Sequence, residues 1–175
     1  MGHALPKPRE PAAEAPQRLD RARFAPANRR RLSAPALRTF LTIADLWGLN
    51  EEERRLILGY PSRSTFHNWA KLAREHQDLT LDVDVLTRIS AVLGIHQALG
   101  ILHKTERDGV AWLRGPHDGA VFGGKPPLEL VTSGSQDGLV TVRRFLDAAR
   151  GGLYIEPNAA DAGFGPYDDA DIVLR

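Results

Sequence analysis

The chain has 175 residues, 42% of them hydrophobic, which is enough for one domain or for two small domains that share a core. It contains no cysteine, which excludes a disulfide framework and any zinc site built from thiolates. No apolar run approaches the roughly 20 residues of a membrane helix, and the arginine-rich start lacks the apolar centre of a secretory signal, so we expect a soluble, cytoplasmic protein.

The net charge of +1 hides an asymmetry between the two ends of the chain. Residues 1–38 carry nine basic and three acidic side chains, whereas residues 151–175 carry five acidic side chains and one arginine. Residues 1–33 are rich in proline and poor in large apolar residues, so we expect a flexible basic arm. The first twenty residues could equally be a solubilising tail, but the cluster Arg29, Arg30 and Arg31 is the better candidate for contact with DNA phosphates.

Two short helices are predicted after the arm. The first begins with Ser33 as N-cap and Pro35 in the first turn, and apolar residues then recur at spacings of three and four as far as Trp47. The second follows Asn50, whose side chain can cap it, and three glutamates occupy its first turn. It ends at Gly59, and Tyr60-Pro61 makes a turn.

The next predicted helix, from about Arg63 to Glu75, is the candidate for reading DNA sequence. Its apolar residues fall on one side, while short polar side chains that can reach base edges project from the other. Any solvent-exposed helix carries a polar face, but the tight turn before this helix and the basic arm favour a role in DNA binding. The expected contacts are Arg29, Arg30, Arg31, Arg63, Ser64, His67, Asn68, Lys71 and Arg74, with the basic side chains on phosphates.

A longer helix, capped by Asp82 or Asp84, is predicted from its apolar spacing up to Leu102. Its residues His96 and His103 lack a third ligand at metal-binding spacing, so we expect no metal site. Later, Pro126-Pro127 begin a short helix over 128–131, and a last helix starts near Asp137 and ends at Gly151-Gly152.

The segment from Gly119 to Lys125 matches a phosphate-binding loop except at the position after the lysine, where Pro126 replaces the Ser or Thr that holds magnesium. No apolar strand precedes it, so we expect a rigid recognition loop. An enzyme remains an alternative only if this loop binds phosphate. No cofactor is expected.

The pair Trp112-Leu113 and the run Phe122-Gly123-Gly124-Lys125-Pro126-Pro127-Leu128 resemble the toxin-binding domain of the MbcA/ParS/Xre antitoxin family, and the upstream helices resemble the Xre-like domain that precedes it there. The resemblance covers roughly 34–152. It implies an all-α protein with an Xre-like helix-turn-helix DNA-binding domain over 34–104 and a toxin-binding module over 105–152. It further implies an antitoxin without catalytic activity that masks a RES-domain toxin, which consumes NAD or uses it for ADP-ribosylation. The resemblance also implies binding to operator DNA and a homodimer or a higher toxin-antitoxin assembly.

The residues after the last helix depart from the family pattern. We expect Gly152 to Glu156 to cover the toxin's NAD pocket. The rest of the acidic tail over 153–175 could plug the same pocket or be a solvated end. The candidate toxin contacts are Trp112, Arg114, Phe122, Leu128, Arg150, Gly152, Leu153, Tyr154, Ile155 and Glu156. Trp112, Phe122 and Leu128 could equally be core residues. The alternative function is a stand-alone transcription regulator whose second half dimerises or senses a ligand.

Overall fold

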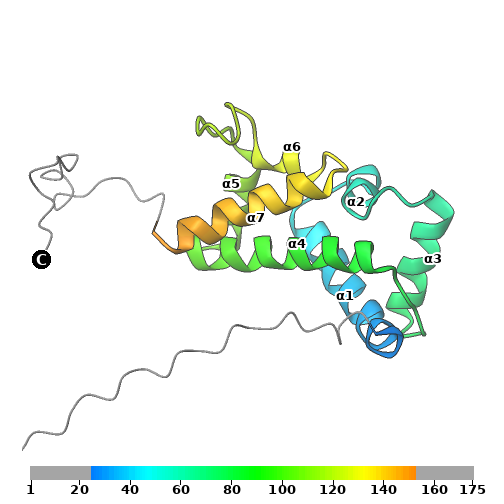
Figure 1. The fold of residues 1–175 in the computed structure, drawn as a ribbon. Helices are drawn as coiled ribbons and strands as arrows, with labels where there is room; N and C mark the ends of the chain where they lie inside the picture. The colour runs from blue at the N-terminus through cyan, green and yellow to red at the C-terminus, as the bar shows by residue number, and fades with distance from the viewer. Residues whose placement is uncertain (1–24, 153–175) are drawn as a thin grey trace, which may run out of the picture.

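The computed structural model describes residues 25–152, and the predictions for the first part of the arm and for the tail lie outside this range. Within it the chain is all-helical (Figure 1). The helices are α1 (Pro26–Leu46), α2 (Glu51–Ile57), α3 (Arg63–Arg74), α4 (Val83–Leu102), α5 (Glu106–Arg114), α6 (Pro127–Val131) and α7 (Gln136–Arg150). The expected fold class is confirmed.

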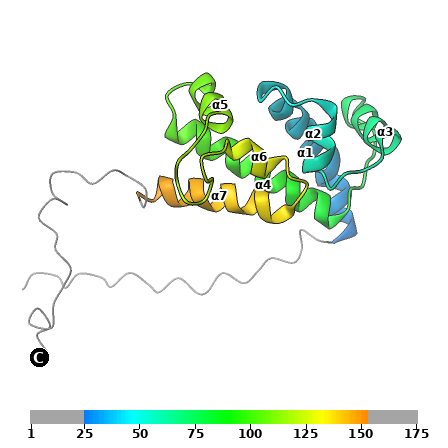
Figure 2. The same ribbon diagram turned by 90° about the horizontal axis from the view of Figure 1, so that it is seen from above.

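Helix α4 is the centre of the molecule. It packs against α1, α5 and α7, and α7 runs beside it in the same direction (Figures 1 and 2). Two arginines fix this pairing, because Arg88 donates to the carbonyl of Gly134 at 3.0 Å and Arg143 donates to the carbonyl of Ser90 at 3.1 Å. One hydrophobic cluster therefore runs from α1 to α7 through α4, and both halves of the chain share it.

By length and composition alone α4 could cross a membrane, although we expected no apolar run of that length. Its packing between α1 and α7 accounts for the same apolar composition, since a central core helix is buried on several sides.

The predicted start of the first helix was wrong. Helix α1 begins at Pro26, so residues 26–33, which we had assigned to the arm, are helical. Ser33 is fully buried inside α1, where its hydroxyl donates to the carbonyl of Arg29 at 2.7 Å and accepts the N–H of Leu81 at 2.9 Å. Pro35 lies in the helix interior rather than in the first turn. A serine that satisfies a distant backbone N–H carries the same local sequence signal as an N-cap.

The caps of α2 and α5 are local hydrogen-bond motifs. Asn50 accepts from the N–H of Glu53 at 2.9 Å and Glu53 accepts from the N–H of Asn50 at 2.8 Å, a complete capping box. Asp82 precedes α4 as expected but makes no side-chain cap bond. Helix α5 was not predicted, although Thr105 caps it by accepting from the N–H of Asp108 at 3.1 Å.

Candidate functional site

The turn between α2 and α3 is held by a buried arginine. Gly59 and Tyr60 both adopt left-handed backbone conformations, with φ of 87° and 60°. Arg55 donates from Nε to the carbonyl of Pro61 at 2.8 Å, and its guanidinium lies 4.4 Å from the centre of the Tyr60 ring. These contacts fix the angle between the two helices. The role of Arg55 in this turn was not predicted from sequence. An arginine in the last turn of a short helix usually interacts only with the negative end of the helix dipole.

The outer face of α3 carries the predicted polar side chains. Phe66, Ala70 and Ala73 are buried against the rest of the domain. The residues that project outward and are exposed are Arg63, Ser64, His67, Asn68, Lys71 and Arg74. An exposed helix after a tight turn, with amide and hydroxyl groups outward, is the arrangement that docks in a major groove. Base contact by these residues stays a prediction.

One glutamate of α2 neutralises part of this face. His67 Nε2 lies 2.9 Å from Glu51 Oε2, and Arg63 Nε lies 3.6 Å from Glu51 Oε1. The hydrogen bond with His67 lowers the pKa of Glu51. Lys71 and Arg74 make no ion pair with another residue of 25–152, so they are the cations of α3 most available to phosphate.

The structure places two of the three clustered arginines beside the end of α3. Arg30 and Arg31, together with Arg38 and His76, line a polar groove of about 410 Å³ at the carboxyl end of that helix. Arg30 pairs with Asp78, and this hydrogen bond lowers the pKa of the aspartate. Arg29 points elsewhere and lines an apolar groove between α1 and α4.

The second half of the chain contains an aromatic cluster between α5, the loop after it and α7. The ring centres of Trp112 and His117 are 4.6 Å apart, those of Phe122 and Phe145 are 4.8 Å apart, and Trp112 meets Phe122 edge-on at 5.9 Å. Phe122 and Leu128 are buried and Trp112 is partly buried. Phe122 and Leu128 therefore pack the chain's own core, while part of Trp112 faces solvent.

The glycine-rich loop is closed on itself. The N–H of Gly124 donates to the carbonyl of His117 at 2.9 Å, and the N–H of His117 donates to the carbonyl of Lys125 at 3.3 Å. Gly123 and Gly124 have positive φ, at 57° and 82°, as a tight turn requires. Helix α5 precedes this loop, in place of the buried strand that delivers a phosphate-binding loop.

Arg114, one of the expected toxin contacts, bridges the two halves of the chain. Its Nε and Nη2 donate to the carbonyl of Trp47 at 2.9 and 2.6 Å, and Nη2 also donates to the carbonyl of Gly48 at 2.9 Å. These carbonyls lie at the carboxyl end of α1, where a cation is favoured. The role of Arg114 in this structure is to hold α5 against α1.

The remaining toxin-binding candidates lie at the end of α7. Arg150 is exposed, and its Nη1 is 3.5 Å from Asp147 Oδ1. Gly152 is exposed and is the last described residue, so Leu153 to Glu156 lie outside the described range. Within residues 25–152 no group of three or more His, Asp or Glu side chains is placed to hold a metal.

Comparison with known proteins identifies both halves of the chain. Residues 26–94 match the family model of the antitoxin Xre-like helix-turn-helix domain, and residues 98–152 match that of the antitoxin Xre/MbcA/ParS C-terminal toxin-binding domain. The two matches meet within α4. An uncharacterized protein of Sinorhizobium fredii (strain NBRC 101917 / NGR234), y4oB, is 38% identical over 116 residues, which are 66% of this chain and 84% of that protein. The chain belongs to the Xre/MbcA/ParS antitoxin family, with an Xre-like helix-turn-helix domain followed by a C-terminal toxin-binding domain.

Proposed function

We propose that this antitoxin neutralises a RES-domain toxin, which consumes NAD or uses it for ADP-ribosylation, and that it represses its own operon by binding DNA. The toxin-binding domain and the helix-turn-helix domain support the two halves of this proposal. The antitoxin itself would bind and mask, and would catalyse nothing. It would meet both partners in the cytoplasm.

The observation that carries the masking proposal is the position of the end of α7. Helices α4 and α7 end side by side (Figures 1 and 2), and the last residues of α4, Ile101 and Leu102, are exposed there, Ile101 to 57%. Contiguous exposed apolar surface favours contact with a partner, and these two side chains would contribute to such a surface. The residues that follow Gly152 are Leu153, Tyr154 and Ile155, so we propose that they extend this apolar surface onto the toxin.

The negative charge of the segment after Ile155 supports a role in masking the toxin. A pocket that binds NAD must accommodate a pyrophosphate and is expected to present positive groups. Glu156 and the aspartates of the tail would enter such a pocket at a high effective concentration, because the docked domain holds them near it. Masking would then be steric and electrostatic.

Truncation tests the masking proposal. A chain that ends at Gly151 should fail to suppress toxicity in co-expression, while a chain that ends at Pro157 should lose only part of its protection. Both should retain operator binding and helical circular dichroism, which serve as the controls. Complete suppression by the chain that ends at Gly151 would place inhibition on the surface of the folded domain instead. If the product of the neighbouring gene does not co-purify with the full chain, this result would favour the alternative function, a stand-alone transcription regulator.

The DNA half of the proposal assigns base reading to α3 and general affinity to its cations. Replacing Asn68 with alanine should reduce discrimination between operator and random DNA, because a base contact costs roughly 1–3 kcal/mol when lost. Replacing Lys71 should weaken binding to both DNAs and flatten the salt dependence. In a competition gel shift, full discrimination by the Asn68→Ala chain would show that another face reads the operator. The antitoxin would bind as a homodimer, because helix-turn-helix proteins commonly read two half-sites.

A further inference from the structure

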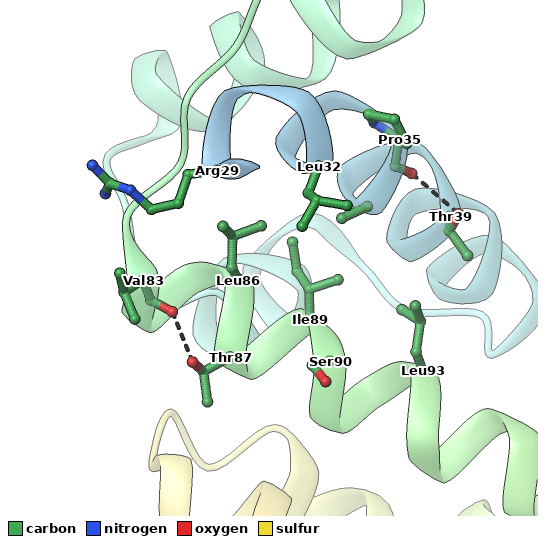
Figure 3. Close-up of a pocket in the computed structure, with 11 residues that line it drawn as sticks. Arg29, Leu32, Pro35, Thr39, Val83, Leu86, Thr87, Ile89, Ser90 and Leu93 are labelled. Atoms are coloured by element: carbon green, nitrogen blue, oxygen red, sulfur yellow. Dashed lines mark hydrogen bonds between the residues drawn. The ribbon is translucent and has the colours of Figure 1, made fainter. Parts of the chain in front are cut away.

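An apolar groove of about 440 Å³ runs between α1 and the first half of α4 (Figure 3). Leu32 and Ala36 line it from α1, and Val83, Leu86 and Leu93 line it from α4. Leu32 and Val83 stand at its edge, each 37% exposed. Covering an apolar groove flanked by an exposed leucine and valine would remove apolar surface from water, which is favourable.

The position of this α1–α4 groove indicates which partner covers it. Every residue that lines it lies between positions 29 and 93, inside the helix-turn-helix match and outside the toxin-binding match. Its lining contains one cation, Arg29, so it does not suit the DNA backbone. No residue of α3 lines the groove, so the groove is separate from the proposed DNA-reading face. It therefore stays open when α3 is in a major groove.

Arg29 and Asp82 lie at one end of the α1–α4 groove without a hydrogen bond between them. Arg29 Nη1 is 3.9 Å from Asp82 Oδ1, too long for a hydrogen bond, and the side chain of Asp82 is 89% exposed. The Nε of Arg29 is buried and has no acceptor among the residues of 25–152. A buried donor without an acceptor is costly, so an additional carboxylate at this end would be favourable.

We propose that the α1–α4 groove is the face through which two copies of this chain form a homodimer. In a two-fold dimer the same patch meets itself, so Leu32 and Val83 of each copy would enter the groove of the other. With the axis near Arg29, each Arg29 would gain the Asp82 carboxylate of the second copy. The inference rests on the homodimer of the proposed function and assigns its interface, and it leaves both copies of α3 free to read the two half-sites.

The first test is the mass of the full chain in solution, measured by size-exclusion chromatography with light scattering. The unmodified chain should be a dimer at micromolar concentration. Leu32→Glu should weaken dimerisation at least tenfold, because the carboxylate would be buried at the contact. Leu46→Glu is the matched control, since Leu46 is 41% exposed on the same helix but does not line the groove. Circular dichroism should show that both variants are folded.

A charge exchange gives a second test that a folding defect cannot imitate. Arg29→Asp places two acids at the groove end and Asp82→Arg places two bases there, so each variant alone should be monomeric. Mixed together, the two variants should form a heterodimer, because each interchain pair then joins opposite charges. Asp82 makes no side-chain cap bond to α4, so its replacement removes no cap.

Several results would overturn the proposal. A monomeric unmodified chain, equal effects of Leu32→Glu and Leu46→Glu, or no heterodimer in the mixture would each exclude this face as the interface. If Leu32→Glu abolished co-purification with the toxin while the unmodified chain was monomeric, the toxin would be the occupant. Toxin neutralisation by Leu32→Glu is measured separately, so a failure of the proposed function leaves the dimer result interpretable.

Discussion

Replacing Arg114 with alanine should destabilise the whole fold rather than only the toxin-binding half. The guanidinium makes three hydrogen bonds to the carbonyls of Trp47 and Gly48, at 2.6 to 2.9 Å. A hydrogen bond from a charged group contributes about 1.5–3 kcal/mol when it is well shielded, but Arg114 is exposed and water would replace part of the loss. We therefore expect the free energy of unfolding to fall by about 2 kcal/mol in total, about a thirtyfold change in the folding equilibrium.

Urea unfolding of the full chain, followed by far-UV circular dichroism, measures this loss. With a denaturant slope of about 2 kcal/mol per molar urea, the midpoint should fall by about 1 M at an unchanged slope. Arg107→Ala is the matched control, because Arg107 is an exposed arginine on the same helix and no ion pair joins it to another described residue. Its midpoint should stay within the error of the unmodified chain.

Equal midpoints for Arg114→Ala and Arg107→Ala would refute this reasoning. The bridge to α1 would then contribute nothing measurable, and the two halves would be joined by the apolar core around α4 alone. A second transition in the Arg114→Ala curve would instead show that the bridge makes the two halves unfold together.

Three further predictions concern packing. Gly138→Ala should lower the unfolding free energy by about 1–3 kcal/mol, because its Cβ would lie 2.2 Å from the carbonyl oxygen of Leu130, whereas Gly119→Ala, with no atom within 4 Å, should be neutral in the same urea assay. Ser33→Ala should cost about 1–2 kcal/mol in a thermal melt, since the buried hydroxyl accepts a backbone N–H from the α3–α4 connection; an unchanged melt would mean that water replaces it. A fragment of residues 105–152 should show little helical circular dichroism, because its helices pack on α4; a folded fragment would show that the module is independent.

The parts of the fold that sequence predicted well are those set by local chemistry. The N-cap at Asn50, the proline start of α6 and the glycines after α7 are signals confined to a few neighbouring residues. The apolar spacing of α3 likewise separated the buried face from the exposed face, because a helix of 3.6 residues per turn repeats that pattern.

The errors arose where a residue serves a distant partner. Ser33 has the sequence of an N-cap, but its hydroxyl satisfies the N–H of Leu81, far along the chain. Trp112 and Arg114 lie on α5, which local reasoning did not predict, because tertiary contacts with His117, Phe122 and the end of α1 stabilise that short helix. The same limit applies to the candidate site. Arg29 stays a predicted DNA contact, but its position beside an apolar groove follows from the packing of α1 on α4, which local sequence does not show.

Masking of the toxin is tested most directly by titrating the toxin encoded by the neighbouring gene with the full antitoxin while NAD consumption is followed. We expect NAD consumption to fall to the background at a fixed stoichiometric ratio, and the chain that ends at Gly151 to fail to inhibit even in large excess. Undiminished NAD consumption at saturating full-length antitoxin would contradict the proposal that this chain masks a RES-domain toxin.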